Sequence, residues 1–217
     1  MKIRFIITLL LASINIIFSQ EKTVKLNGNE ILTINVPENG RVENRIYKCN
    51  LFDWKITIPD NYSITDQKRT EELEKKGYEA TKKANPNIKV NPHPTQLIGF
   101  EKDKYNYFKS SFESLDGTKK VTLEEHKKFS EQLLSETYSK IKELKFELSS
   151  SSDVKLGKYI FYKIQIRLYN PQNDKLLLTQ ELYNTFIDNH LFSVSINYTN
   201  EQDGMLLNYT FKKSFEK

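Results

Sequence analysis

Residues 156–200, LGKYIFYKIQIRLYNPQNDKLLLTQELYNTFIDNHLFSVSINYTN, decide the fold because they predict three consecutive antiparallel strands. Side chains on a strand alternate between two faces, so residues two apart share a face. The opposite face of the first strand is apolar at Tyr159 and Phe161 and polar or charged beyond them, which predicts partial cover. The core-facing set of that strand is apolar throughout: Ile160, Tyr162, Ile164, Ile166 and Leu168.

The next two strands follow the same alternation and are separated by turn residues. Pro171, Asn173 and Asp174 predict the first turn, and Asp188 with Asn189 predicts the second. A one-residue slip would turn each apolar set outward, so the pattern specifies the register. The apolar sets are Leu176, Leu178, Leu182 and Phe186 on the second strand, and Phe192, Val194, Ile196 and Tyr198 on the third, opposite Ser193, Ser195 and Asn197.

Three helices are predicted around these strands. The longest covers residues 122–144, where Thr122-Leu123-Glu124-Glu125 forms a capping box and apolar residues recur at helical spacing. Residues 65–84 predict a loosely docked surface helix with a thin apolar face of Leu73, Tyr78 and Ala80. Residues 200–215 predict a C-terminal helix that closes the sheet with Leu207, Phe211 and Phe215.

Further strands are expected before the long helix. Residues 23–26 and 31–36 predict two short strands, with Asn27-Gly28-Asn29 as the turn between them. In residues 45–58, Trp54, Ile56 and Ile58 alternate with polar residues, which indicates a strand with one buried face. Residues 96–100 and 105–112 predict a hairpin.

This order of elements resembles the PsbP/Mog1-like family, in particular its small exported bacterial members. The segments that carry the resemblance, within residues 47–217, are FDWKITIPDNYSIT, QLIGFEKDKYNYFKSSFE, TLEEHKKFSEQLLSETYSKIKEL, LGKYIFYKIQI with QELYNTFIDNHLFSVSINY, and FKKSF. The resemblance implies an α+β fold, an α/β/α sandwich whose mainly antiparallel central sheet is flanked by helices. A rival fold is a cone-like domain whose helices gather on the concave side of a curved sheet.

The family's known members are mostly non-catalytic and dock onto a small GTPase or a photosynthetic membrane complex. No partner-contact motif of either kind occurs here, so the resemblance assigns no binding residues.

The amino terminus predicts an export signal. Lys2 and Arg4 precede an apolar run of 14 residues, from Phe5 to Phe18, which is shorter than the roughly 20 residues of a spanning helix. We therefore expect cleavage near Ser19-Gln20 and an exported, periplasmic or secreted, mature chain; an uncleaved anchor is the alternative. The expected organisation is a signal peptide at 1–19, an N-terminal extension with short strands at 20–46 and a PsbP/Mog1-like domain at 47–217.

The sequence contains no motif that predicts catalysis, a cofactor or a metal. Its single cysteine, Cys49, is interpreted as a small buried residue, and its three histidines, His93, His126 and His190, lack metal-ligand spacing. His126 follows two glutamates and is interpreted as a surface residue of the long helix. No catalytic, cofactor-binding or metal residue is therefore nominated, and we expect the protein not to be an enzyme.

The charge of the chain also excludes function classes. The formal charge of +5 is spread over lysines interleaved with glutamates, without a basic stripe that would bind nucleic acid. No later stretch is apolar enough to form an integral membrane segment of the mature chain. The favoured hypothesis is an exported, non-catalytic binding or accessory domain for a protein partner, of unspecified identity, in the cell envelope. The alternatives are a small-molecule or lipid carrier, using a gap beneath residues 65–84, and a cryptic hydrolase using Cys49 or a histidine.

Overall fold

A computed structural model of the chain describes residues 22–26, 30–34, 39–87, 95–115 and 121–216. Its helices are α1 (Gln67–Ala84), α2 (Leu123–Ser139) and α3 (Glu201–Lys213). The strands of its large sheet are β6 (Ser63–Ile64), β7 (Thr95–Glu101), β8 (Tyr107–Ser114), β9 (Lys145–Leu148), β10 (Ser152–Leu156), β11 (Tyr159–Tyr169), β12 (Leu176–Ile187) and β13 (His190–Tyr198). Two smaller sheets contain β1 (Lys22–Leu26) with β2 (Glu30–Ile34), and β3 (Gly40–Glu43), β4 (Ile46–Cys49) and β5 (Lys55–Thr57).

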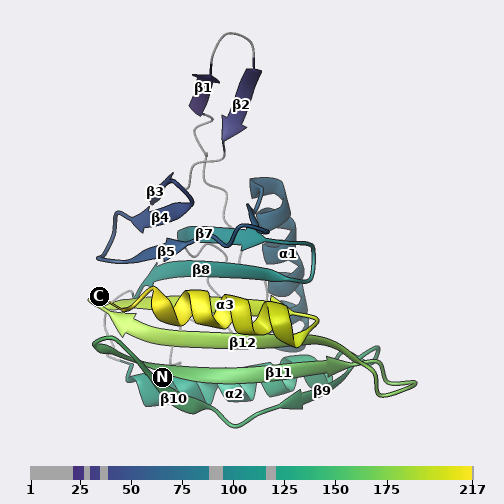
Figure 1. The fold of residues 1–217 in the computed structure, drawn as a ribbon. Helices are drawn as coiled ribbons and strands as arrows, with labels where there is room; N and C mark the ends of the chain where they lie inside the picture. Colours follow the sequence, from purple (N-terminus) through teal and green to yellow (C-terminus); the bar gives the residue numbers. More distant parts are fainter. Residues whose placement is uncertain (1–21, 27–29, 35–38, 88–94, 116–120, 217) are drawn as a thin grey trace.

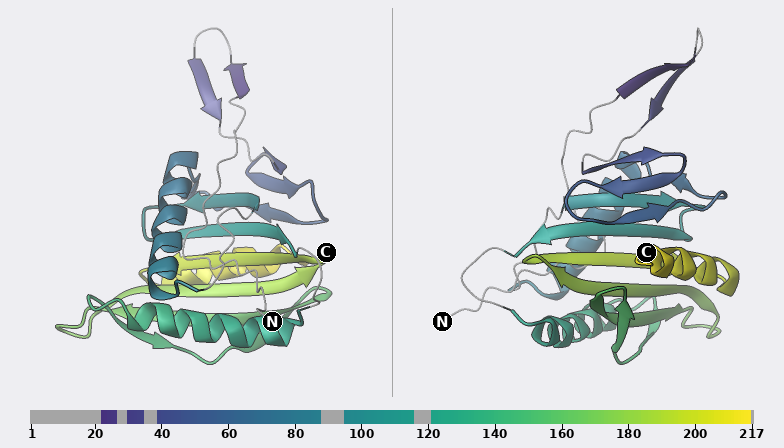
Figure 2. Two further views of the ribbon diagram at one scale, coloured as in Figure 1. Left: turned by 180° about the vertical axis from the view of Figure 1, so that it is seen from behind. Right: turned by 60° about the vertical axis from the view of Figure 1, so that its left-hand side comes forward.

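The large sheet is sandwiched between helices. Its strand order is β10-β11-β12-β13-β8-β7-β6, with β9 also pairing to β11, and every pairing between the described strands is antiparallel. Helix α3 crosses one face, while α1 and α2 lie on the other (Figures 1 and 2). Cover on both faces confirms the predicted α+β sandwich and excludes the cone-like rival.

The three predicted strands at the centre of the sheet are confirmed as β11, β12 and β13. The turn between β12 and β13 uses Asp188 and Asn189, both with positive φ, as residues that tolerate this geometry do. Ile160 and Leu176, however, are 56% and 42% exposed, so their expected place in the core is wrong. Both lie at strand ends, Ile160 beside the β10–β11 turn and Leu176 at the start of β12.

Each sheet face has its own apolar core. On the α2 face, Ile164 and Ile166 pack with Leu133, Leu134 and Tyr138 of the helix. The face towards α3 forms the larger core, in which rings dominate: Tyr47, Trp54, Phe100, Phe108, Phe161, Tyr183, Phe192 and Phe211. Full burial of such side chains is worth about 2–3 kcal/mol each, so these layers hold the sandwich together.

The C-terminal helix is confirmed with its predicted contacts. Asn200 caps α3 by accepting a hydrogen bond from the Asp203 amide at 2.9 Å. Leu207 and Phe211 are fully buried, and Phe215 packs partly buried against the same core.

The long helix is shorter than predicted, and two strands beside it were missed. The capping box is confirmed, but α2 ends at Ser139 rather than near residue 144. Ile141 and Leu144 still pack against the core from the following turn. Strands β9 and β10 pair with β11. They begin after residue 144, where the predicted helix ends, and neither was predicted; residues 149–152 were expected to be a short polar linker.

The small sheets agree with the expected strands in part: residues 45–58 form two strands, β4 and β5, where one was expected, and β3 was not predicted. Trp54, Ile56 and Ile58 are all buried, as their alternation predicts. Strands β1 and β2 pair as the predicted hairpin; its turn residues 27–29, like residues 35–36 of the predicted second strand, lie outside the described residues. Strand β3, within the predicted extension, pairs with β4, and the domain division at residue 47 stays a prediction.

Helix α1 has the predicted span, but small and polar residues form its buried contacts. Gly77, Thr81, Ala84 and the following Asn85 are buried, whereas Tyr78 and Ala80 are only partly covered and the side chain of Leu73 lies outside the described residues. The Asn85 side-chain amide donates to Thr137 Oγ1 of α2 at 3.1 Å. A polar contact therefore ties α1 to α2, where a thin apolar stripe was expected.

Candidate functional site

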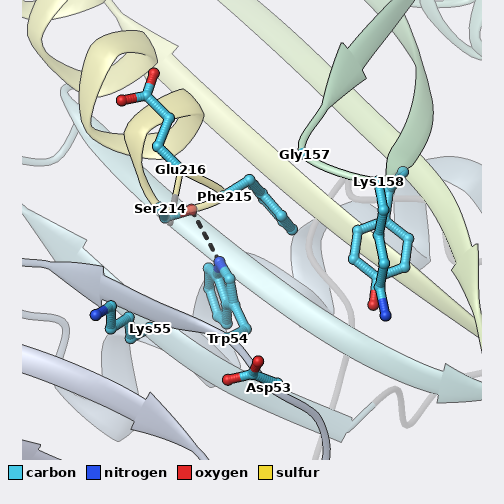
Figure 3. Close-up of a pocket in the computed structure, with 9 residues that line it drawn as sticks. Asp53, Trp54, Lys55, Gly157, Lys158, Ser214, Phe215 and Glu216 are labelled. Carbon is cyan, nitrogen blue, oxygen red and sulfur yellow. Dashed lines mark hydrogen bonds between the residues drawn. The ribbon is translucent and has the colours of Figure 1, made fainter.

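A groove of about 940 Å³ opens at the C-terminal end of α3 (Figure 3). Three segments far apart in the sequence line it: residues 53–55 where β5 begins, 157–159 at the β10–β11 turn, and 214–216 after α3. Gly157 takes a positive φ of 55°, and a Cβ on it would lie 2.9 Å from the Phe215 carbonyl oxygen. Glycine thus permits the close approach of the turn to the end of α3.

The groove has an aromatic lining. The rings of Trp54 and Phe215 are stacked with centroids 6.5 Å apart, and Tyr159 meets Phe215 edge-on at 6.0 Å. The indole Nε1 of Trp54 donates to Ser214 Oγ at 2.9 Å, and that hydroxyl donates to the Phe211 carbonyl at 2.6 Å. Ser214 is the only hydroxyl-bearing aliphatic residue of the lining, and both of its contacts are structural.

Charged side chains surround this lining. Asp53, Lys55, Lys158 and Glu216 line the groove, and Lys158 Nζ lies 5.1 Å from the centroid of the Tyr159 ring. No ion pair joins any of these four to another residue in the described part of the chain. Trp54 is buried, so Tyr159 and Phe215, which are partly exposed, supply the accessible aromatic surface. Such a surface with charges around it suits binding, because it offers apolar contact together with charges that can select a partner.

The cysteine and histidines do not form a site with one another in the described structure. Cys49 is partly buried against the α3-side core, and the Leu51 amide donates to its sulfur at 3.4 Å. His190 stacks on Phe112 with centroids 4.5 Å apart. His93 lies outside the described residues.

His126 is buried, so its interpretation as a surface residue is wrong. Only 3% of the residue is exposed; its Nδ1 lies 2.6 Å from the Tyr162 hydroxyl, which also lies 3.0 Å from Ser130 Oγ. Its Nε2 has no hydrogen-bond partner, and burial lowers the pKa of His126 from 6.5 to about 4. The spacing along the helix could have predicted this burial, since His126 lies three residues after Leu123 and seven before Leu133 and therefore shares their apolar face.

A row of polar side chains crosses the sheet beneath α1 and α2. Ser111, Ser193, Asn184 and Tyr162 lie side by side on β8, β13, β12 and β11. Ser193 Oγ donates to Asn184 Oδ1 at 2.7 Å, but Ser111 Oγ has no hydrogen-bond partner. Sequence alternation found the polar set of β13 but gave no sign that a helix layer buries it.

On the α3 face, a buried carboxylate is fully engaged. Glu181 accepts hydrogen bonds from Lys163 at 2.8 Å, Gln165 at 2.9 Å and Tyr198 at 3.2 Å. Burial on its own raises the pKa of Glu181, but the hydrogen bonds from Lys163 and Gln165 and the Lys163 charge outweigh it and hold the pKa below 4.5. These hydrogen bonds connect β11, β12 and β13, and they already occupy the Glu181 carboxylate.

Two features are missing from the described residues. They contain no group of three or more His, Cys, Asp and Glu side chains arranged to hold a metal ion. None of the helices in the described ranges has both the length and the apolar character needed to span a membrane.

Comparison with known proteins supports the fold alone. No family model matches the sequence, and no curated protein matches it. The structure is similar to the solution structure of cyanobacterial PsbP (CyanoP) from Synechocystis sp. PCC 6803, with a TM-score of 0.50, 9% sequence identity, and coverage of 78% of this chain and 87% of that chain. The fold is PsbP-like. This likeness confirms the architecture implied by the sequence resemblance, while membership of the family stays a prediction.

Proposed function

We propose that this chain is an exported, non-catalytic accessory domain that binds a protein partner in the cell envelope through the groove at the end of α3. The observation that carries the proposal is the groove itself, an aromatic surface with unpaired charges around it. The resemblance to the PsbP/Mog1-like family supports it, because known members of that family mostly dock onto other proteins. Export rests on the predicted signal at residues 1–19, which lie outside the described residues.

The serine hydroxyl of the groove lining is not held beside a general base. A nucleophile needs a base within hydrogen-bond reach, and the Ser214 hydroxyl instead contacts Trp54 and the α3 backbone. Cys49 is on β4, His126 on α2 and His190 at the start of β13, so among the described residues no cysteine–histidine pair supports the hydrolase alternative.

Site-specific photo-crosslinking in cells of the native host would test the proposal. The photoreactive residue p-benzoylphenylalanine replaces Lys158 at the groove or, as the matched control, Lys128 on α2, whose side chain is 72% exposed. We expect one discrete adduct from position 158 and none of the same mass from 128. Lys55→Glu on the opposite side of the groove should weaken that adduct. The same adducts from both positions, or none from position 158, would contradict docking at the groove.

A small-molecule carrier remains the second candidate, because the groove volume falls within the roughly 300–1,000 Å³ of ligand pockets. The lining contains no residue of α1, so this site differs from the gap expected beneath residues 65–84. Native mass spectrometry of the mature chain purified from its host distinguishes the two. Retention of a small molecule by the wild-type chain, lost in the Lys158→Glu variant, favours the carrier. The mass of the chain without any ligand, together with a protein adduct in the photo-crosslinking experiment, favours the accessory domain.

A further inference from the structure

The outer face of α3 exposes large apolar side chains. Met205 is 67% exposed, Tyr209 is 60% exposed and Leu206 is 37% exposed. Met205 and Tyr209 are four residues apart, so they lie one above the other on the same side of the helix. Figure 1 shows α3 across the front of the large sheet, with no described element over its outer side.

The fold does not need these side chains. Leu207 and Phe211 supply the buried contacts of α3, and Gly204 lies directly against the Tyr198 ring. Met205 and Tyr209 face the opposite way, and the Tyr209 hydroxyl accepts a hydrogen bond from Lys213 Nζ at 3.0 Å. Single exposed apolar residues are ordinary, whereas neighbouring ones such as Met205, Leu206 and Tyr209 form a candidate interaction surface, called the α3 stripe below.

The two ends of α3 carry opposite charges, so the exposed face of α3 is complementary in charge to an antiparallel copy of itself. Glu201 and Gln202 are exposed in the first turn, and Lys212 and Lys213 are exposed in the last. No ion pair involves Glu201, Lys212 or Lys213 in the part of the chain that the structure describes. The hydrogen bond to Tyr209 and, to a smaller extent, the charge of Glu216 raise the pKa of Lys213. The helix dipole favours the same distribution of charge, but it gives no reason for the exposed Met205 and Tyr209 between the two ends.

We infer that the occupant of this face is a second copy of the chain, with α3 packed antiparallel to its counterpart across a twofold axis. In such an isologous contact, residue i meets j and j meets i. With the axis between Met205 and Tyr209, Met205 of each copy packs beside Tyr209 of the other. Glu201 then lies beside Lys213 of the second copy, and Gln202 lies beside Lys212.

The expected dimer is weak. A 13-residue helix is about 20 Å long at 1.5 Å per residue, and one helix pair buries less than the roughly 800 Å² per partner of a standard interface. We therefore expect a micromolar or weaker dissociation constant. The contact is independent of the groove partner, because it needs only this chain.

Sedimentation-equilibrium ultracentrifugation of the mature chain, from low to high micromolar protein, tests this inference. We expect a monomer–dimer equilibrium that Met205→Glu weakens by about tenfold or more, as loss of a central apolar contact does. Leu177→Glu is the matched control, because Leu177 is 40% exposed on β12 and should leave the equilibrium unchanged.

Charge reversal makes the antiparallel geometry testable. Glu201→Lys or Lys213→Glu alone should weaken the dimer, and the two together should restore it, since the pair across the interface is then re-formed with opposite signs. Circular dichroism checks that each variant keeps α3. A monomer at every concentration, or a dimer unaffected by Met205→Glu, overturns the inference; a dimer without charge rescue overturns the antiparallel pairing. In the photo-crosslinking experiment, an adduct of twice the chain mass joins two copies of the chain and is not the heterologous partner.

Discussion

Lowering the pH from 7 to 5 should remove about 2 kcal/mol of stability through His126 alone, and about 3 kcal/mol by pH 4. The side chain is buried, and its pKa is lowered from 6.5 to about 4. The unfolded chain therefore takes up the proton more readily than the folded one. The resulting loss of stability is absent above about pH 6.5, grows as the pH falls, and stops growing below about pH 4.

Urea denaturation of the mature chain and of a His126→Gln variant, each at pH 7, 6, 5 and 4, would measure this effect. Glutamine does not titrate, so the difference between the two unfolding free energies isolates His126. Carboxylates with lowered pKa values, such as Glu181, also destabilise the fold in acid, but they do so in both proteins and cancel. Parallel pH profiles for the two proteins would refute the burial of an uncharged His126.

Three further changes probe the packing. Ile164→Asp should abolish the cooperative thermal transition seen by circular dichroism, because Ile164 is 1% exposed and an unpaired charge in a core is very costly. The control variant Ile160→Asp, at an exposed position of the same strand, should keep a normal thermal transition. Ser110→Ala should lower the free energy of unfolding in urea by about 1 kcal/mol, since the Ser110 hydroxyl donates to the Ile98 carbonyl at 2.9 Å. Ser111→Ala should lower it by less than about 0.5 kcal/mol, because the Ser111 hydroxyl has no hydrogen-bond partner. Equal losses for the two variants would contradict this difference. Gly204→Ala should lower the free energy of unfolding by about 1–3 kcal/mol, because the added Cβ would lie 2.6 Å from the Tyr198 ring. This loss is expected despite the higher helix propensity of alanine. An unchanged denaturation midpoint would show that the Tyr198 ring moves freely.

Local patterns predicted the elements whose stability is encoded locally. The capping box at Thr122 specifies where α2 begins, and Asp188-Asn189 specifies a tight turn between two strongly alternating strands. Strands β9 and β10 are different, because their sequences, KFEL and SDVKL, are short and carry charges. They become strands by pairing with β11, a long-range interaction that a window along the sequence does not contain.

Burial on the helix-covered face was harder to predict than strand position. Ser193, Ser195 and Asn197 alternate with apolar residues as a solvent-facing set would, yet all three are buried. These three side chains are buried only because α1 and α2 cover that face of the sheet. The groove escaped prediction for a similar reason, because its three lining segments meet only in the folded chain and share no motif.

The positions of the groove and the α3 stripe connect the two proposals. The groove lies beyond the C-terminal end of α3, and an antiparallel pair places its two C-terminal ends at opposite ends of the contact. A dimer built this way therefore carries one groove at each end, and neither groove is consumed by dimerisation. Two grooves on one assembly bind a partner that presents two copies of its motif more tightly than one groove does. Weak self-association through Met205 and Tyr209 would then select repeated or clustered partners in the envelope over isolated ones.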